Sequence, residues 1–242
     1  MQNERIVSAT EHSRAVRAMF SGIAKRYDLL NHVLSANIDK RWRRLVREKL
    51  AAVLADDKAV VLDVACGTGD LSLELQKHAK ARVIGTDFCR PMLAIAIEKT
   101  AKVDLGVSYV EADAMQLSFT DESFDAVTIA FGLRNLSNSE EGLKELRRIL
   151  KPNGKLAVLE FSAPFVPGFK ALFNFYFTRV LPRIGGMISG SRGAYEYLPD
   201  SVSKFPDQKN LVQMMQRAGF SDVEYDNLTG GIAAIHTGIK EV

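Results

Sequence analysis

The stretch AVVLDVACGTGDLSLELQ, residues 59–76, decides the fold of this chain. It opens with an apolar run typical of a buried strand, passes through Gly67 and Gly69, and continues with a helical pattern that places Leu71 and Leu75 on one face. The stretch therefore predicts a strand, a glycine-rich turn and a helix in succession.

The alternation of strand and helix continues along the chain. Further strands are predicted at residues 82–87, 107–113, 124–131 and 155–162, with helical patterns after the first and third of them. Strands that alternate with helices predict a doubly wound parallel sheet.

The C-terminal part of the chain departs from this alternation of strand and helix. A turn at residues 152–154 is expected to lead into the strand at 155–162. Beyond it, residues 210–240 predict a helix stopped by Gly219 and then two strands joined near residues 230–231. Because their connection is short, these two strands are expected to be antiparallel.

The composition is that of a globular protein with one core, at 242 residues, 47% hydrophobic and 25% charged. No linker, repeat or low-complexity tract divides it, so we expect a single domain over residues 1–242. Its two cysteines, Cys66 and Cys89, argue against a disulfide scaffold. No apolar run reaches the roughly 18 residues needed to cross a bilayer, and the charged N-terminus is unlike a signal peptide. We therefore expect a cytoplasmic protein.

Six basic residues gather within ten positions around Trp42, although the net charge of the whole chain is only +3. They are Lys40, Arg41, Arg43, Arg44, Arg47 and Lys49. One interpretation is a solvated helix face, and the other is a patch that attracts a polyanion such as anionic lipid or nucleic acid.

The glycine-rich turn is suited to hold a ligand, although the two glycines alone are also typical of a plain tight turn. Gly67 and Gly69 tolerate positive φ and have no Cβ, so backbone N–H groups can approach a ligand closely. Asp87 ends the second predicted strand, where a carboxylate can accept hydrogen bonds from two ribose hydroxyls. A dinucleotide fingerprint has a third glycine where this chain has Ser72, so a nucleoside is favoured over NAD.

A parallel sheet finished by an antiparallel hairpin resembles the class I S-adenosylmethionine-dependent methyltransferase fold. The resemblance implies a Rossmann-like, seven-stranded α/β sheet with residues 1–50 as an N-terminal helical cap on its open edge. It also implies bound S-adenosylmethionine, with the adenine amino group at Asp113. The implied cofactor-binding residues are Gly67, Thr68, Gly69, Asp87, Asp113, Ala114 and Ala130. Alternatives are a helix cap or turn for Asp113 and a hydrogen bond within its own turn for Thr68.

Four segments narrow the resemblance. Residues 130–135 read AFGLRN, where methyltransferases that act on the exocyclic amines of bases carry an Asn/Asp-Pro-Pro-aromatic run. Together with residues 27–43, 151–162 and 195–206, this segment resembles the ubiquinone/menaquinone biosynthesis C-methyltransferases over nearly the whole chain. Three positions depart from that family, in which glycine is usual at Asn37 and Asn153 and serine is frequent at Ala130.

This resemblance implies methylation of a ring carbon in a polyprenylated quinol. The expected substrate is demethylmenaquinol; the alternatives are 2-methoxy-6-polyprenyl-1,4-benzoquinol of ubiquinone biosynthesis and another small molecule. Such an enzyme must align the carbon with the S–CH₃ bond and exclude water. Loss of a hydroxyl proton activates the quinol, because the phenolate spreads its charge to the ortho carbon.

The predicted catalytic residues are Arg134, Asn135 and Tyr27. Arg134 is the candidate for stabilising the phenolate and Asn135 is a second donor, since each pre-placed donor contributes roughly 3 kcal/mol. The base is left open between a water held by Arg134 and the side chains of Tyr27, Asp28 and His32, because a guanidinium stays protonated. The alternatives are a surface salt bridge for Arg134, a helix cap for Asn135 and core positions for Tyr27 and His32.

Residues 161–190 are rich in phenylalanine but interrupted by proline, glycine and cations, so they are not expected to span a membrane. We expect residues 161–205 to form an aromatic lid over the lipid tail and, with the basic cluster, to contact an anionic membrane surface peripherally. The alternative is an insertion packed on the sheet or against a partner subunit, which leaves a homo-oligomer open. We expect no nucleic acid partner.

Overall fold

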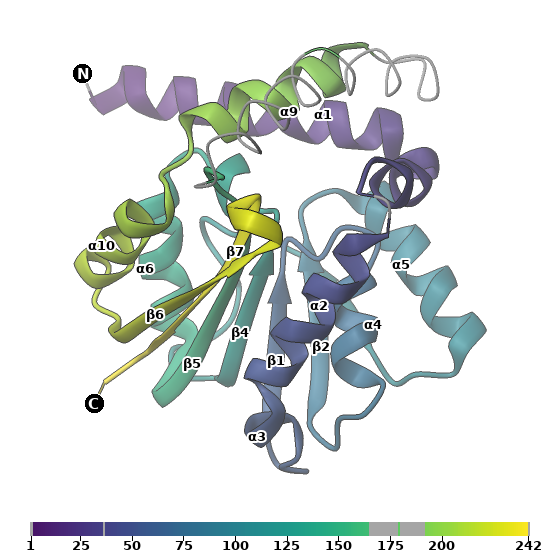
Figure 1. The fold of residues 1–242 in the computed structure, drawn as a ribbon, viewed down its shortest axis with the longest axis vertical. Helices are drawn as coiled ribbons and strands as arrows, with labels where there is room; N and C mark the ends of the chain where they lie inside the picture. Colours follow the sequence, from purple (N-terminus) through teal and green to yellow (C-terminus); the bar gives the residue numbers. More distant parts are fainter. Residues whose placement is uncertain (1, 36, 165–178, 180–191, 242) are drawn as a thin grey trace.

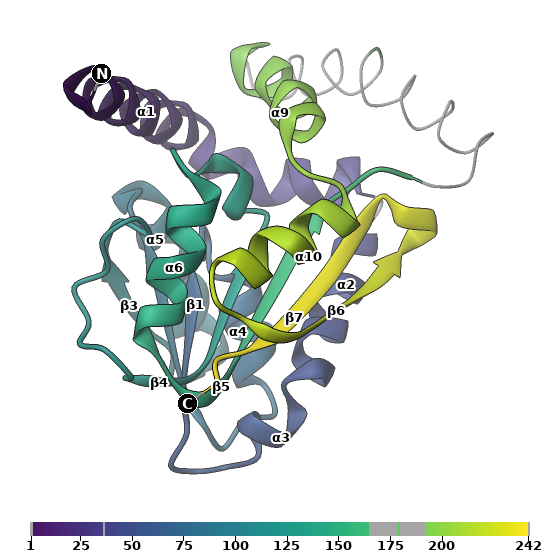
Figure 2. The same ribbon diagram turned by 90° about the vertical axis from the view of Figure 1, so that its left-hand side faces the viewer.

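The computed structural model describes residues 2–35, 37–164, 179 and 192–241, which form one seven-stranded sheet with helices on both faces (Figures 1 and 2). The strands lie in the order β3-β2-β1-β4-β5-β7-β6. Their bounds are β1 Val60–Val64, β2 Arg82–Asp87, β3 Ser108–Glu111, β4 Phe124–Ala130, β5 Leu150–Phe161, β6 Ser221–Leu228 and β7 Ala233–Ile239. β1 to β5 are parallel, and β7 is antiparallel to β5 and β6. The predicted sheet with its C-terminal antiparallel hairpin is confirmed.

The helices surround this sheet (Figures 1 and 2). On one face lie α6 (Ser139–Ile149) and α10 (Gln208–Arg217). On the other lie α2 (Ile38–Lys49), α3 (Ala51–Leu54), α4 (Asp70–Gln76) and α5 (Arg90–Val103). Across the carboxyl ends of the strands lie α1 (Gln2–Leu34) and α9 (Arg192–Lys204), with the short turns η1 (Leu133–Asn135) and η3 (Thr229–Gly231) nearby. Among the described residues, no helix is both long and apolar enough to cross a membrane.

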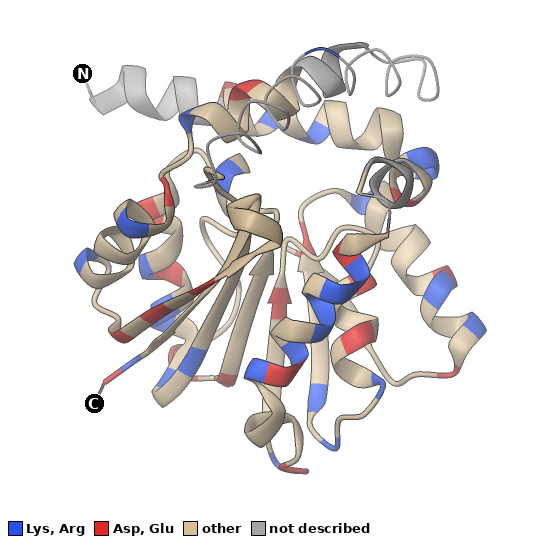
Figure 3. Ribbon diagram, in the orientation of Figure 1, with Lys and Arg blue, Asp and Glu red and all other residues tan. Residues whose placement is uncertain are grey.

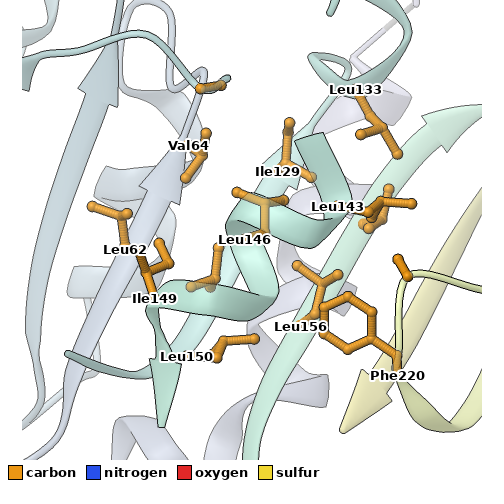
Figure 4. Close-up of a cluster of buried hydrophobic side chains, with 14 of the residues drawn as sticks. Leu62, Val64, Ile129, Leu133, Leu143, Leu146, Ile149, Leu150, Leu156 and Phe220 are labelled. Atoms are coloured by element: carbon orange, nitrogen blue, oxygen red, sulfur yellow. The ribbon is translucent and has the colours of Figure 1, made fainter. Parts of the chain in front are cut away.

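Alternation along the strands divides their side chains between two cores. In β1, Leu62 and Val64 face α6, whereas Val61 faces α2 and α4. Figure 4 shows the first core, whose labelled members are Leu62, Val64, Ile129, Leu133, Leu143, Leu146, Ile149, Leu150, Leu156 and Phe220. Burying each such side chain contributes about 2 kcal/mol, and close packing makes the sheet a rigid platform. The carboxyl ends of the strands are thereby held in fixed positions.

α6 begins where the sequence supplies a cap. Asn138 Oδ1 accepts hydrogen bonds from the backbone N–H groups of Glu140, at 3.1 Å, and Glu141, at 3.2 Å. The first residue of the helix, Ser139, donates its hydroxyl to the carbonyl of Leu133 at 3.1 Å. The start of α6 therefore fixes η1, the turn that carries two of the predicted catalytic residues.

The two asparagines at positions where the resemblance implies glycine both lie in the left-handed region of backbone space. Asn37, before α2, and Asn153, inside β5, each have a φ of 62°. Asparagine tolerates this conformation better than most residues, so both loops keep a shape that glycine would also allow. The turn predicted at residues 152–154 is an irregularity inside β5, where the register with β4 shifts between Phe124 and Ala126.

A buried carboxylate in β1 ties this strand to its neighbours. Asp63 is 0% exposed; its Oδ2 accepts a hydrogen bond from Ser72 Oγ at 2.6 Å and its Oδ1 from Thr128 Oγ1 at 2.8 Å. Burial raises the pKa of Asp63 to about 6, although both hydroxyl donors act in the opposite direction. The link between β1, α4 and β4 is therefore sensitive to pH.

We expect the stability of the native protein relative to Asp63→Asn to depend on pH. Because the folded-state pKa lies above the unfolded value of 3.8, the contribution of this carboxyl is fully present below 3.8 and is lost as the pH rises through about 6. The native protein should lose up to about 3 kcal/mol of unfolding free energy relative to the variant between about pH 4 and about pH 7. Urea denaturation at a series of pH values measures this difference. A difference that stays constant over that range would contradict the argument.

Candidate active site

A pocket lies where the carboxyl ends of β1, β2 and β4 meet, and it contains about 710 Å³ of empty space, counting the solvent at its mouth. Seven of the ten predicted site residues line it: Tyr27, Gly67, Asp87, Asp113, Ala114, Ala130 and Asn135. Thr68, Gly69 and Arg134 are not part of its lining. The strand ends thus bring most of the predicted residues to one place, as expected for a doubly wound sheet.

The apolar residues of the pocket lining were not among the residues predicted from the sequence. Phe88 and Phe131 stand at the ends of predicted strands, and that position was a usable signal. Phe20 of α1 and Met92 of α5 also line the pocket, but their helical patterns alone do not distinguish them from core residues. The pocket lining is therefore more apolar than its predicted residues alone suggest.

Asp87 organises the glycine-rich loop. Its Oδ2 accepts a hydrogen bond from the backbone N–H of Gly67 at 2.8 Å, and its Oδ1 accepts one from Cys89 at 2.8 Å. The residue is 7% exposed, and burial raises the pKa of its carboxyl while the backbone donors oppose that shift. Each oxygen keeps a second lone pair, so the carboxylate can still accept hydroxyl groups of a ligand.

The lining fits a cationic nucleoside. A Cβ at Gly67 would meet only Tyr27 within 4 Å, so glycine leaves free the space in which a ligand can contact the loop. The charged residues of the described lining are Asp87 and Asp113, with no lysine or arginine among them. Asp113 is exposed, and its Oδ1 accepts a hydrogen bond from the N–H of Met115 at 2.9 Å. This negative lining attracts a cation such as a sulfonium and repels a pyrophosphate.

Thr68 and Gly69 support the loop from behind. The Thr68 hydroxyl donates to Asp28 Oδ1 of α1 at 2.5 Å, so its hydrogen bond is neither to its own turn nor inside the pocket. Gly69, with a φ of 79°, is the N-cap of α4, and a Cβ there would come within 2.5 Å of the Tyr109 hydroxyl. Both residues therefore serve close packing around the pocket.

A chain of ion pairs continues this support to the N-terminal helices. Lys99 Nζ of α5 bonds to Asp28 at 2.7 Å and also to Asp70 of α4. Arg43 of α2 pairs with Asp39 at 2.6 Å and with Asp70 at 3.1 Å. Four helices are thus joined through carboxylates around the glycine-rich loop.

Arg134 lies behind the pocket wall and is only 7% exposed. Its Nη1 donates to Glu160 Oε1 at 3.0 Å, to Glu160 Oε2 at 2.9 Å and to the carbonyl of Phe131 at 2.7 Å. The salt bridge considered for Arg134 thus exists, but it is buried rather than on the surface. Asn135 is in the wall, where its Nδ2 donates to the carbonyl of Phe131 at 3.1 Å and its Oδ1 accepts from the Tyr197 hydroxyl at 3.1 Å.

Three aromatic side chains pack together next to the pocket: Phe131 lines it, and Trp42 and Phe161 support Phe131 from behind. The ring centroid of Phe131 lies 4.8 Å from that of Phe161 and 6.0 Å from that of Trp42. Arg134 Cζ lies 5.4 Å from the centre of the Phe161 ring, within cation–π range. Phe131 also has a φ of 55°, a strained conformation that is commonest at functional sites. The guanidinium is therefore held against an apolar, aromatic wall.

The side chains considered as the catalytic base differ in where the structure places them. Tyr27 lines the pocket, whereas Asp28 is committed to Thr68 and Lys99. The side chain of His32, and most of the expected lid at 161–205, lie outside the described residues. Glu160 was missed, although one carboxylate at the end of the apolar run LAVLEF is a signal for a buried acidic group.

A doubly wound sheet with a C-terminal antiparallel hairpin and a negatively charged nucleoside pocket at its strand ends defines the class I S-adenosylmethionine-dependent methyltransferases. Within this class, the model of the ubiE/COQ5 methyltransferase family matches residues 7–240. The chain belongs to that family, so the predicted family and the predicted methyl donor, S-adenosylmethionine, are confirmed.

Curated relatives match along almost their whole length. A demethylmenaquinone methyltransferase of Thermus thermophilus is 53% identical, over 91% of this chain and 99% of the relative. A protein of the same name from Deinococcus radiodurans is 46% identical, over 95% and 94%. The ubiquinone/menaquinone biosynthesis C-methyltransferase UbiE of Citrifermentans bemidjiense is 44% identical, over 96% and 98%.

Solved structures agree with the fold. The crystal structure of a Thermotoga maritima SAM-dependent methyltransferase, described as a possible histamine N-methyltransferase, superposes with a TM-score of 0.64. The comparison covers 93% of this chain and 99% of that chain at 19% identity. At this identity the likeness concerns the architecture of the sheet and its helices.

We expect Asp87→Ala to weaken binding of S-adenosylhomocysteine by about 100-fold, because hydrogen bonds to a buried carboxylate contribute roughly 1.5–3 kcal/mol each. Asp87→Asn should not restore binding, since its NH₂ group would face the N–H of Gly67 or Cys89. Asp104→Asn, at an exposed position outside the pocket lining, serves as the matched variant and should keep native affinity. Titration calorimetry measures all three; equal losses at both positions would contradict this role of Asp87.

Proposed function

We propose that this enzyme transfers the methyl group of S-adenosylmethionine to a ring carbon of a polyprenylated quinol, with demethylmenaquinol as the substrate. The observation that carries the proposal is the junction of two environments: a negatively charged nucleoside pocket and an aromatic wall whose Phe131 lines that pocket, supported from behind by Trp42 and Phe161. A flat, apolar acceptor fits beside such a wall. The names of the Thermus and Deinococcus relatives favour a demethylmenaquinol over the benzoquinol of ubiquinone biosynthesis.

Asp87, Asp113 and the backbone at Gly67 are the residues that would hold the cofactor. When bound, S-adenosylmethionine supplies an electrophilic methyl group on a positively charged sulfur. The chain itself orients the acceptor and excludes water, through the aromatic wall on one side and α1 on the other. Phe20 and Tyr27 of α1 make an edge-to-face contact at 5.9 Å that closes this side of the pocket.

The polar side chains at η1 act on the quinol oxygen. Loss of its proton gives a phenolate, and a donor held in a site of low polarity stabilises that charge more strongly than water does. Asn135 is in the pocket wall and Arg134 is directly behind it, with both side chains anchored on the carbonyl of Phe131. We therefore assign oxyanion stabilisation to Arg134 and Asn135, with Tyr27 bordering the substrate.

We expect Arg134→Gln to leave affinity for S-adenosylhomocysteine nearly unchanged and to lower turnover of a demethylmenaquinol by about 100- to 1000-fold. The glutamine amide can still donate to Glu160, which limits the cost of a carboxylate stranded in the core. Arg148→Gln is the matched control, because Arg148 pairs with Glu145 away from the pocket. Calorimetry and a methyl-transfer assay separate binding from turnover. Full turnover in Arg134→Gln would refute the assignment.

We also propose that the enzyme rests on the membrane surface in which its prenylated substrate resides. Half of the basic cluster forms ion pairs within the chain: Arg43, Arg47 and Lys49 pair with Asp70, Glu74 and Asp226. Lys40, Arg41 and Arg44, all on α2, are exposed (Figure 3), as is Lys49 in its surface ion pair. Two apolar side chains are also exposed: Ile38 at the start of α2, at 38%, and Leu29 in α1, at 57%. Apolar side chains flanked by cations favour anionic bilayers.

We expect Leu29→Ser/Ile38→Ser to reduce binding to anionic liposomes in a sedimentation assay. The matched control is Ile97→Ser/Val103→Ser on α5, where the native side chains are 56% and 54% exposed. That variant should bind like the native enzyme, and neutral liposomes should bind all three proteins weakly. The idea fails if the native enzyme does not bind anionic liposomes, or if both double variants lose binding equally.

A further inference from the structure

Glu160 is a buried carboxylate among apolar residues, and besides the guanidinium of Arg134 it accepts hydrogen bonds from the backbone N–H groups of Phe161, at 3.0 Å, and Arg134, at 3.4 Å. Alternation along β5 puts it on the same side as Leu156 and Val158, which are core residues, and it is 1% exposed. Replacing a buried ion pair by apolar residues is often neutral or stabilising, so the pair with Arg134 is weak evidence for a role in stability. This placement points to a chemical role.

The contact between the two residues leaves the guanidinium unsaturated. Both oxygens of Glu160 bond to one nitrogen of Arg134, Nη1, instead of to two nitrogens of the guanidinium fork. Arg134 Nε is buried and has no hydrogen-bond partner among the described residues. The guanidinium therefore faces Glu160 through one nitrogen and keeps an unpaired, buried donor at Nε.

The pair is connected to the pocket through Asn135. Arg134 and Asn135 bond to the same carbonyl, that of Phe131, at 2.7 and 3.1 Å. A quinol oxygen bound at Asn135 would therefore lie beside the guanidinium. The phenol of Tyr197 bonds to the other side of the Asn135 amide at 3.1 Å and completes a polar cluster between η1, β5 and α9.

The other titratable side chains considered for this cluster have hydrogen-bond partners of their own or lie away from Arg134. Asp28 bonds to Thr68 and Lys99, and Asp87 bonds to the glycine-rich loop. His12 Nε2 lies 3.2 Å from the carbonyl of Asn135, and because a carbonyl only accepts, this nitrogen carries its proton. Of the described carboxylates, Glu160 is the one that touches Arg134.

We propose that Glu160 accepts the proton that the quinol hydroxyl loses before methylation, while Arg134 faces the negative charge both before and after this transfer. The inference rests on the proposed function and assigns the base of that same site. In this step the quinol O–H bond breaks, an O–H bond forms on Glu160, and the negative charge moves from the carboxylate to the quinol oxygen. The net charge of the site does not change, so no new charge is created in the apolar surroundings.

The remaining protons also balance. Once the ring carbon has been methylated, the proton on that carbon is lost and the quinol oxygen regains one, which restores the aromatic ring. Glu160 then releases its proton to water and returns to the carboxylate. The whole reaction thus liberates one proton, as expected when a cationic donor and a neutral quinol give two neutral products.

The electrostatics of Glu160 support this role. Burial raises the pKa of its carboxyl, and the opposing effect of Arg134 does not cancel that shift. A base of raised pKa takes a proton from a phenol more readily than an exposed carboxylate does. Burial also raises the pKa of Tyr197, with Arg134 acting against that shift, so this phenol stays protonated as a donor.

The variant Glu160→Gln tests the proposal. Its amide oxygen still accepts from Arg134, whereas its NH₂ group faces a backbone N–H from which Glu160 accepts a hydrogen bond, so thermal unfolding is measured beside binding. We expect a folded variant that binds S-adenosylhomocysteine like the native enzyme. Turnover of a demethylmenaquinol should fall by about 100-fold or more. The native rate should decrease at acid pH as Glu160 takes up a proton and should level off above that range; in the variant the levelling off should be absent, because the rate keeps climbing with pH as more quinol ionises.

A more acidic substrate separates a base from a group that merely holds Arg134. With a ring-halogenated quinol, which ionises without help, the variant should come within about tenfold of the native enzyme. Glu145→Gln is the matched control, since Glu145 forms a Glu–Arg pair with Arg148 at 2.7 Å away from the pocket. It should keep the native rate and pH profile with both substrates.

A spectroscopic measurement is independent of turnover. When a quinol is added to the enzyme with S-adenosylhomocysteine, infrared difference spectra should show the carbonyl band of a newly protonated carboxyl, and Glu160→Gln should lack it. The inference would be overturned if Glu160→Gln kept the native rate and the native pH profile. It would also be overturned if His12→Gln, instead of Glu160→Gln, changed that pH profile. If the native enzyme methylates no quinol, the proposed function itself fails, which is a separate result.

Discussion

A carboxylate removed from water must be met by hydrogen-bond donors, and the site depends on three carboxylates that obey this constraint. Asp63 of β1, Asp87 of β2 and Glu160 of β5 are each at most 7% exposed. Because leaving any of them unpaired would cost several kcal/mol, each one fixes the donors that it collects. Those donors are the hydroxyls of Ser72 and Thr128, the backbone of Gly67 and Cys89, and the guanidinium of Arg134. The carboxylates thereby join the strands to the loops that surround the pocket.

The sequence alone predicts those features of the fold that depend on local sequence pattern. The strands, the hairpin and the convergence of Gly67 and Asp87 follow from apolar runs and from the rule that parallel strands end at one edge of the sheet. The partners of side chains could not be predicted in this way. Thr68 bonds to Asp28 and Arg134 bonds to Glu160, and both contacts join residues that are distant in sequence. Only the docking of α1 and the alignment of β4 with β5 bring them together.

The docking of α1 also explains why the cofactor loop is not an independent unit. Residues of this helix line the pocket, and Asp28 on the same helix accepts a hydrogen bond from the hydroxyl of Thr68 in the loop. Lys99 carries the connection on to α5. A ligand on the loop is therefore covered by a helix that is also held by ion pairs, so water exclusion and loop geometry depend on the same contacts. A disturbance of either one is expected to affect the other.

The distribution of charge around the pocket suits a reaction that consumes charge. The nucleoside end is lined by Asp87 and Asp113, which favour a cation, whereas Arg134 at the other end favours an anion. When a cation and an anion combine to give neutral products, charge diminishes toward the transition state, so low polarity between the reactants is favourable. The aromatic wall around Phe131 and Phe161 supplies that low polarity. Glu160, paired with Arg134, keeps the anionic end neutral until the quinol oxygen takes over the charge, so Arg134 faces one negative charge up to the methyl transfer and again once Glu160 has released its proton.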